Sequence, residues 1–279
     1  KGGISSLLSV IGKMSDLQKT TLLFYCDEEY DFHGMKKFVT SLNRKELPEL
    51  ALVIEPTNLN IWNAHRGLIE IRFSILGKSG HSANPKGAKN SNLFLMYLVN
   101  SIQNTLLNFK HPFFGLPSFN VSYMHGGLYR GNRDHNPILG NEGNNIPDYT
   151  EAVFEIRTTK IELNAERIKG EIKRFALAKG FEVNNFQIRH DLAPLFTDPR
   201  RIKNLITAVK EVNEKAKILD PSIKGYSDGQ IIDQYLKIPV VYIGPGGDGM
   251  HASSEYVSIS SLRKLENIYS NIFKHFDCI

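Results

Sequence analysis

The stretch TTLLFYCDEE, residues 20–29, indicates how this chain folds. Residues 20–26 form a continuous β-prone run that is short enough for a buried parallel strand, and three acids follow it. A second apolar run, ELALVIEPT at 49–57, ends in another acid, Glu55. Strands that alternate with helices predict a layered α/β domain, whose functional groups gather at the carboxyl ends of its strands. We therefore expect both acidic clusters at that edge of the sheet.

The pattern changes between residues 64 and 190. Strands with alternating polar and apolar residues are expected at 68–75, 118–124, 151–159 and 181–191, and helices at 92–107 and 165–178. This β-α-β-β-α-β order is that of a ferredoxin-like module. A buried strand and a terminal helix then resume the first pattern. The predicted organisation is an α/β domain, residues 1–63 and 191–279, interrupted by an inserted module at 64–190.

The composition is that of a folded globular protein. Of 279 residues, 41% are hydrophobic and 23% charged, and no apolar run reaches the roughly 18–20 residues of a membrane span. The net charge of +5 is spread over short basic spots, which does not favour a nucleic-acid partner. Cys26 and Cys278 make neither a disulfide framework nor a Cys-rich zinc site, and Cys26 is expected in the core. With no visible targeting signal, we expect a reducing, cytoplasmic location and no membrane partner.

Acidic side chains mark the ends of both apolar runs. Glu28 and Glu29 follow the first run, and neighbouring side chains of an extended backbone point in opposite directions. One of them can therefore bind a metal while the other faces a bound water. The alternative is an ordinary acidic helix start. For Glu55 at the end of the second run, the alternative is an acid in a surface loop.

Two histidines lie in loops that follow strands. His81 belongs to GKSGHSANP at 77–85, and His251 belongs to the glycine-rich GPGGDGMHASSEYV at 244–257. For a single histidine, a structural or merely exposed role is the alternative. A glycine-rich strand exit can bind a phosphate or carboxylate on its backbone N–H groups, but this one is not a P-loop. A serine-nucleophile hydrolase has little support, since the chain contains no G-x-S-x-G.

Carboxylates and a histidine from separate strand ends suit zinc or a similar divalent ion. The same residues lie in motifs that together resemble the zinc-dependent amidohydrolase family of acetylornithine deacetylase, succinyl-diaminopimelate desuccinylase, aminoacylase and the glutamate carboxypeptidases. The motifs, in chain order, are KGG at 1–3, DEE at 27–29, EPT at 55–57, HRG at 65–67, GHSANP at 80–85, NNIPD at 144–148 with EIR ending at 157, SDG at 227–229, and GPGG with HASSEY at 244–256.

The resemblance implies a catalytic α/β domain interrupted by a ferredoxin-like lid that dimerises. In the catalytic domain, it implies that Glu28 is the general base and acid. It also implies three metal ligands, which are Glu29, Glu55 and His251. The glycine loop that would line the substrate pocket contains Gly246 and Gly247.

The resemblance assigns three further residues to the lid. His81 is similar to the histidine that reaches across the dimer and stabilises the oxyanion in the partner's active site. Asn145 and Arg157 are similar to residues that hold the substrate, the arginine on a substrate carboxylate. If His81 acts across the dimer, the monomer should be nearly inactive.

The implied activity is metal-dependent hydrolysis of the amide bond of a small N-acyl amino acid, such as acetylornithine or succinyl-diaminopimelate, in amino-acid biosynthesis. Two zinc ions about 3.5–4 Å apart would lower the pKa of a bridging water. Cobalt or manganese could take the place of zinc in this ligand set. The expected assembly is a homodimer formed through the lid.

The chain departs from the family pattern at its start. The histidine of an H-x-D motif and a bridging aspartate two residues before KGG are both missing, because the chain begins at that KGG. We expect about 100 further residues to precede Lys1 in the full protein. The alternatives are a di- or carboxypeptidase on the same scaffold, and a catalytically incomplete module that dimerises or binds. The acyl group and amino acid of the substrate do not follow from the residues.

Overall fold

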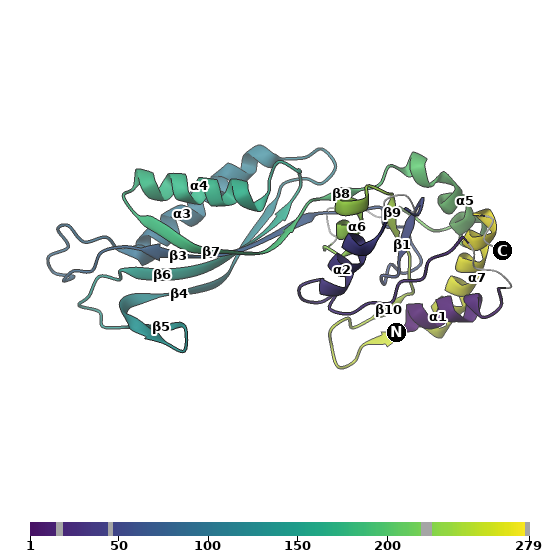
Figure 1. The fold of residues 1–279 in the computed structure, drawn as a ribbon, viewed down its shortest axis with the longest axis horizontal. Coiled ribbons are helices and arrows are strands. Elements are labelled where there is room, and N and C mark those ends of the chain that lie inside the picture. Colours follow the sequence, from purple (N-terminus) through teal and green to yellow (C-terminus); the bar gives the residue numbers. More distant parts are fainter. Residues whose placement is uncertain (15–18, 44–46, 219–224, 277–279) are drawn as a thin grey trace. The chain divides into compact units, whose positions relative to one another are not determined.

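The computed structural model describes residues 1–14, 19–43, 47–218 and 225–276, and the chain divides into two compact units (Figure 1). The first unit combines Lys1–His65 with Leu195–Ile279, and the second unit is Arg66–Pro194. Both units contain helices packed on strands, so the fold is mixed α/β.

The first unit is built on a short parallel ladder. β1 (Ala51–Val53) pairs in parallel with β9 (Val240–Tyr242). Two antiparallel ladders of two residues each complete its strands: β2 (Ala64–His65) with β8 (Leu195–Phe196), and β10 (Gly247–Asp248) with β11 (Tyr256–Val257).

Helices cover this ladder because each of them has an apolar face. α6 (Gly229–Leu236) packs on β1 and β9, and α2 (His33–Ser41) packs on α6. α1 (Gly2–Ile11) and α5 (Lys203–Val212) both contact α7 (Ile259–His275). Side chains of these three helices share one buried cluster with β9: Val10, Leu205, Val209, Val241, Leu265 and Ile268.

The strand expected over residues 20–26 is not formed. This segment has no regular secondary structure, Phe24 is 56% exposed, and Cys26 is exposed although we expected it in the core. A strand pairs its backbone N–H and C=O groups with a neighbouring strand, and within the described residues this segment pairs with none. Its β propensity is therefore not realised. Cys278 lies outside the described residues.

The second unit is an antiparallel sheet with strand order β5-β4-β6-β3-β7. The strands are β3 (Gly67–Leu76), β4 (Ser118–Arg133), β5 (Asn136–Gly140), β6 (Tyr149–Thr158) and β7 (Glu182–Leu192). β3 and β6 pair along their whole length, from Gly67 with Thr158 to Leu76 with Tyr149. The start of β3 and the end of β6 therefore lie together.

Two helices cover one face of this sheet, α3 (Ser91–Leu106) and α4 (Ala165–Ala178) (Figure 1). Each begins at an asparagine whose side chain accepts a hydrogen bond from the first turn, Asn90 for α3 and Asn164 for α4. Short 3-10 helices span Leu107–Phe109 and Pro199–Ile202. None of the helices within the described ranges is long and apolar enough to cross a membrane.

Candidate active site

Glu28 and Glu29 lie in a turn of the first unit, between the extended segment and α2. Asp27 adopts a left-handed backbone conformation, with φ of 70°, and its carboxylate accepts a hydrogen bond from the His33 backbone N–H. α2 begins only at His33 and carries no acid in its first turn. The pair of glutamates therefore does not serve as an acidic helix start.

Glu28 is half-buried, and its carboxyl group has an unusual affinity for a proton. Burial, followed by repulsion from Asp228 and from Glu29, raises the pKa of Glu28 to about 7 from an ordinary value of 4.5. His251 acts in the opposite direction and lowers it. Such a pKa places Glu28 in the range in which a carboxylate both takes and returns a proton near neutral pH.

Glu55 lies two residues after the end of β1 and is held against the segment that follows β9. A Cβ atom added to Gly244 would lie 2.1 Å from the Glu55 carbonyl oxygen, so only glycine allows the two backbones to approach this closely. The Ser227 hydroxyl donates to Glu55 Oε1 at 3.4 Å. Burial first, and then repulsion from Glu28 and Asp228, raise the pKa of Glu55 to about 7.

His251 comes close to Glu29 in the same unit. Its Nδ1 lies 3.8 Å from Glu29 Oε1, and both side chains are open to solvent, 77% and 67% exposed. His251 has a φ of 63°, an uncommon conformation for a residue with a side chain. Strained backbone of this kind is frequent at functional sites.

Four residues expected at the site interact through these contacts and charges: Glu28, Glu29, Glu55 and His251. Carboxylates and an imidazole are suitable donors for a divalent cation, and a cation would relieve the repulsion that raises the two pKa values. The donor groups of this cluster therefore suit a divalent metal ion. Over the described ranges, no group of three or more His, Cys, Asp or Glu side chains is placed to hold an ion.

The cluster includes two residues that the sequence analysis did not single out. Asp228, at the start of α6, is completely buried, and its charge raises the pKa of both Glu28 and Glu55. Burial, and then the nearby charge of Asp228, raise the pKa of the Tyr25 hydroxyl. The signal for Asp228 was its place in the SDG motif, which we used only as part of the resemblance.

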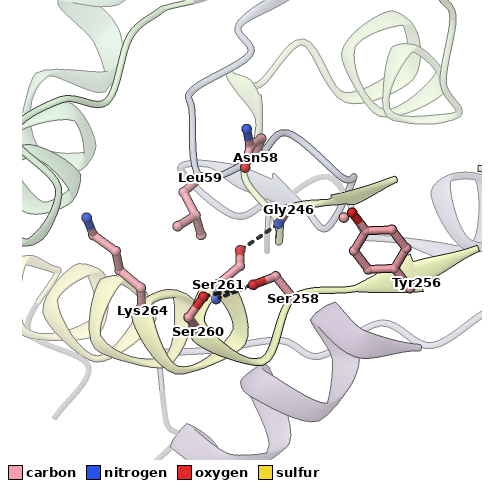
Figure 2. Close-up of a pocket in the computed structure, with 9 residues that line it drawn as sticks. Asn58, Leu59, Gly246, Tyr256, Ser258, Ser260, Ser261 and Lys264 are labelled. Carbon is pink, nitrogen blue, oxygen red and sulfur yellow. Dashed lines mark hydrogen bonds between the residues drawn. The ribbon is translucent and has the colours of Figure 1, made fainter. Parts of the chain in front are cut away.

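Gly246 and Gly247 border a separate pocket of about 360 Å³, next to the start of α7 (Figure 2). Gly246 N donates to Ser261 Oγ at 2.6 Å, and Gly247 belongs to β10. The described residues that line the pocket are Asn58, Leu59, Gly246, Gly247, Tyr256, Ser258, Ser260, Ser261 and Lys264. The acidic cluster is not part of this lining, so the structure places the two glycines beside a different cavity.

His81 and Asn145 are brought together in the second unit. They form an isolated antiparallel bridge, supported by hydrogen bonds from Ser82 N to Asn144 O and from Ile146 N to Gly80 O. His81 is exposed, and its Nδ1 accepts from Ala83 N at 3.1 Å. The two residues, 64 positions apart in the chain, are therefore held next to each other by the backbone.

Arg157 lies at the other end of the same sheet. It is opposite Leu68 at the start of β3, whereas the His81 loop follows the end of β3. From Tyr149 to Arg157 is eight residues of strand, or roughly 27 Å. Arg157 Nη2 contacts Glu155 Oε1 at 3.0 Å. Within one chain, Arg157 therefore cannot share a substrate contact with His81 and Asn145.

The sequence of the chain matches the model of a known protein family. The model described as "Peptidase family M20/M25/M40" matches residues 1–275. The chain belongs to peptidase family M20/M25/M40. This match confirms the resemblance seen in the motifs, and two kinds of enzyme named there, a succinyl-diaminopimelate desuccinylase and an acetylornithine deacetylase, are among the relatives of the chain.

Curated relatives resemble the chain over most of its length. A succinyl-diaminopimelate desuccinylase from Pelagibacter ubique is 29% identical over 265 residues, which is 92% of this chain and 65% of the relative. An acetylornithine deacetylase from Buchnera aphidicola is 24% identical over 286 residues, 99% of this chain and 70% of the relative. The chain thus spans about two thirds of the length of these relatives.

Solved structures of the family share the fold. The aminopeptidase PepT from Bacillus cereus superposes with a TM-score of 0.73 at 15% identity and covers 99% of this chain, which spans 70% of that structure. A dinuclear metal binding peptidase of family M20 from Bacillus subtilis superposes with a TM-score of 0.63 at 15% identity, over 97% of this chain and 69% of that structure.

Proposed function

We propose that this chain is the larger part of a metal-dependent hydrolase that cleaves the amide bond of an N-acyl amino acid in amino-acid biosynthesis. The observation that carries the proposal is the acidic cluster of the first unit, where burial and then repulsion from neighbouring acids raise the pKa values of Glu28 and Glu55 to about 7, and His251 lies beside Glu29. The curated relatives that are deacetylases or desuccinylases of this kind support the choice of reaction.

In this proposal, Glu29, Glu55 and His251 are the residues that hold the metal. A divalent ion such as zinc, or cobalt or manganese in its place, would supply Lewis acidity and a water of lowered pKa. Glu28 accepts the proton of the attacking water and then delivers it to the leaving amine. The raised pKa of Glu28 suits both steps, since a general base works best when its pKa lies near the working pH.

We further propose that the second unit is a ferredoxin-like lid and the first unit the catalytic domain. The order β3-α3-β4-β6-α4-β7, with β3 and β6 at the centre of the sheet, supports this assignment. The lid would form a homodimer and carry His81 to the partner's active site, where the imidazole stabilises the oxyanion. Because a backbone bridge joins Asn145 to His81, we expect both to act on the partner's substrate.

Arg157 then has a different task from these two residues. Its place at the far end of β6 separates it from His81 and Asn145, and its assignment to a substrate carboxylate rests on the resemblance. Gly246 and Gly247 stay assigned to the substrate loop, on the resemblance alone. A cytoplasmic location completes the proposal and rests on the sparse cysteines, of which Cys26 is exposed and unpaired.

The proposal is tested with the full-length protein, loaded with zinc or cobalt and assayed on matched panels of N-acetyl and N-succinyl amino acids, dipeptides and longer peptides. We expect the N-acyl amino acids to be hydrolysed fastest and a chelator to abolish turnover. Glu28→Gln should retain the metal and lose at least about 100-fold in kcat, since it removes the proton acceptor.

Other results of this test would lead to different conclusions. Faster cleavage of peptides than of N-acyl amino acids would make the protein a peptidase on the same scaffold. Turnover by Glu28→Gln at the wild-type rate would remove Glu28 from the chemistry. A full-length protein with no tight divalent site would be a binding or dimerising module instead of an enzyme.

A further inference from the structure

Asp228 is a buried carboxylate that the proposed mechanism does not use. It is 0% exposed, and its Oδ1 lies 3.3 Å from the Ser227 hydroxyl. Its Oδ2 is also buried and has no hydrogen-bond partner. A carboxylate oxygen without a partner is costly to bury, so its presence needs an explanation.

Helix capping does not supply that explanation. Asp228 is the N-cap residue of α6, but its side chain makes no capping hydrogen bond to the helix. A serine or asparagine could begin α6 equally well without placing a charge in the interior. The carboxylate therefore does not serve the start of the helix.

The contacts of Asp228 lead to the acidic cluster. The Ser227 hydroxyl lies between two acids, 3.3 Å from Asp228 Oδ1 and 3.4 Å from Glu55 Oε1. Tyr25, in the segment that leads to Glu28, lies close enough to Asp228 for each of the two groups to affect the pKa of the other. Asp228 thus contacts Ser227, which donates to Glu55, and lies near Tyr25 in the segment that precedes Glu28.

We propose that Asp228 is a positioning residue for cation binding: through Ser227 it orients Glu55, and its buried negative charge favours a divalent ion at Glu55. The inference rests on the proposed function, because it concerns the same cluster. A hydroxyl has one proton, so Ser227 can donate to only one of the two acids at a time. A cation bound to Glu55 compensates the negative charge of that carboxylate. The Ser227 hydroxyl can then donate its hydrogen bond to Asp228. The bound ion thereby stabilises both acids.

The decisive variant is Asp228→Asn, which keeps the side-chain volume and removes the charge. Affinity is measured on the full-length protein by titration with Co²⁺, followed by visible absorption, and with Zn²⁺ in competition with a chelator. We expect the affinity to fall about 10- to 100-fold, as is typical when a group behind a metal ligand is removed. The melting temperature of the metal-free protein should stay equal or rise, because a buried charge without a full set of partners is removed.

Two further variants sharpen the test. Asp233→Asn changes an aspartate within α6 that is only partly buried, and it should leave the cation affinity unchanged. Ser227→Ala removes the hydroxyl between Asp228 and Glu55 and should weaken the affinity, but less than Asp228→Asn does, since the charge stays. Together they separate the effect of charge at Asp228 from a general effect of changing α6.

Three outcomes would overturn the inference. Wild-type affinity in Asp228→Asn would show that the carboxylate does not act on the cation. A lower melting temperature of the metal-free variant would assign Asp228 to the stability of the fold. An equal loss in Asp233→Asn would show that α6 is merely sensitive to substitution. Failure of the proposed function is distinguishable from these, because then the wild-type protein itself binds no divalent ion.

Discussion

Glu28 and Glu55 have unusually high proton affinities for glutamates. The pKa of each is raised to about 7, first by burial and then by neighbouring acids. Both folded-state values lie above the ordinary value of 4.5. The folded state therefore binds more protons than the unfolded state between these two values, and the free energy of unfolding decreases as the pH rises.

For the metal-free protein, we predict a melting temperature that falls between pH 5 and pH 8. The stabilisation from the protonated acids is complete below about pH 4.5 and is lost as the pH rises through about 7. Glu55→Gln should flatten this dependence, because the amide cannot ionise. Thermal melts in chelator at constant ionic strength measure both curves. A melting temperature that rises over the same range in the wild-type protein would contradict the prediction.

Among individual residues, the motifs identify the groups of the site but not the environments of these groups. The motifs point to Glu28, Glu29, Glu55 and His251. In the structure, these four residues belong to one unit and interact through contacts and charges. Asp228 was missed as an individual residue because its significance lies in its burial and in its contact with Ser227. Neither property can be read from three letters of sequence.

Helix α3 has an exposed apolar strip opposite the side that packs on the sheet. Leu93 is 49% exposed, Met96 56% and Tyr97 63%, at the spacing of one helix face. An apolar strip on the outside of a helix is typical of an interface. This strip is a suitable surface for the proposed lid dimer.

Met96→Asp should therefore weaken self-association by at least about tenfold, since a charge would be buried in an apolar contact. The dimer dissociation constant is measured by sedimentation of the full-length protein. The matched control is Leu177→Asp on α4, which changes a leucine that is 81% exposed and lies outside the strip. Equal dissociation constants for Met96→Asp and the wild type would exclude α3 from the interface.

Among helices and strands, prediction succeeded where the element packs against or pairs with others in the described part of the chain. The helix expected at 165–178 is observed as Ala165–Ala178, and the strand expected at 68–75 as Gly67–Leu76. The strand expected at 20–26 was wrong, although its residues are equally β-prone. Propensity is local, but a strand also needs a pairing partner, and within the described part of the chain this segment pairs with no strand.

The two units have separate cores, which allows their stabilities to be tested separately. Phe154 is fully buried in the second unit, where its ring meets those of Phe73 and Phe119, both with centroids at 4.9 Å. Leu265 is fully buried in the first unit, within the cluster shared by α1, α5 and α7. Both units are compact by their internal contacts.

We predict that Phe154→Ala destabilises only the second unit, by about 3–5 kcal/mol, and leaves the divalent-ion affinity of the first unit unchanged. Leu265→Ala should destabilise the first unit by about 2–5 kcal/mol and weaken ion binding. Amide hydrogen exchange, read separately for the two units, measures the stability of each. Loss of protection throughout the chain in Phe154→Ala would show that the units unfold as one.

By itself, the sequence determined the family, the alternation of helices and strands, and the residue types of the site, because these depend on local pattern and on motif. Only the tertiary structure decided which groups meet. In the folded chain, His81 pairs with Asn145, and Arg157 lies at the far end of their sheet. Asp228 is buried next to Ser227, which donates to Glu55. The physical reason is that strand pairing, burial and charge repulsion arise between residues far apart in the chain. Their strength depends on distances that no local pattern contains.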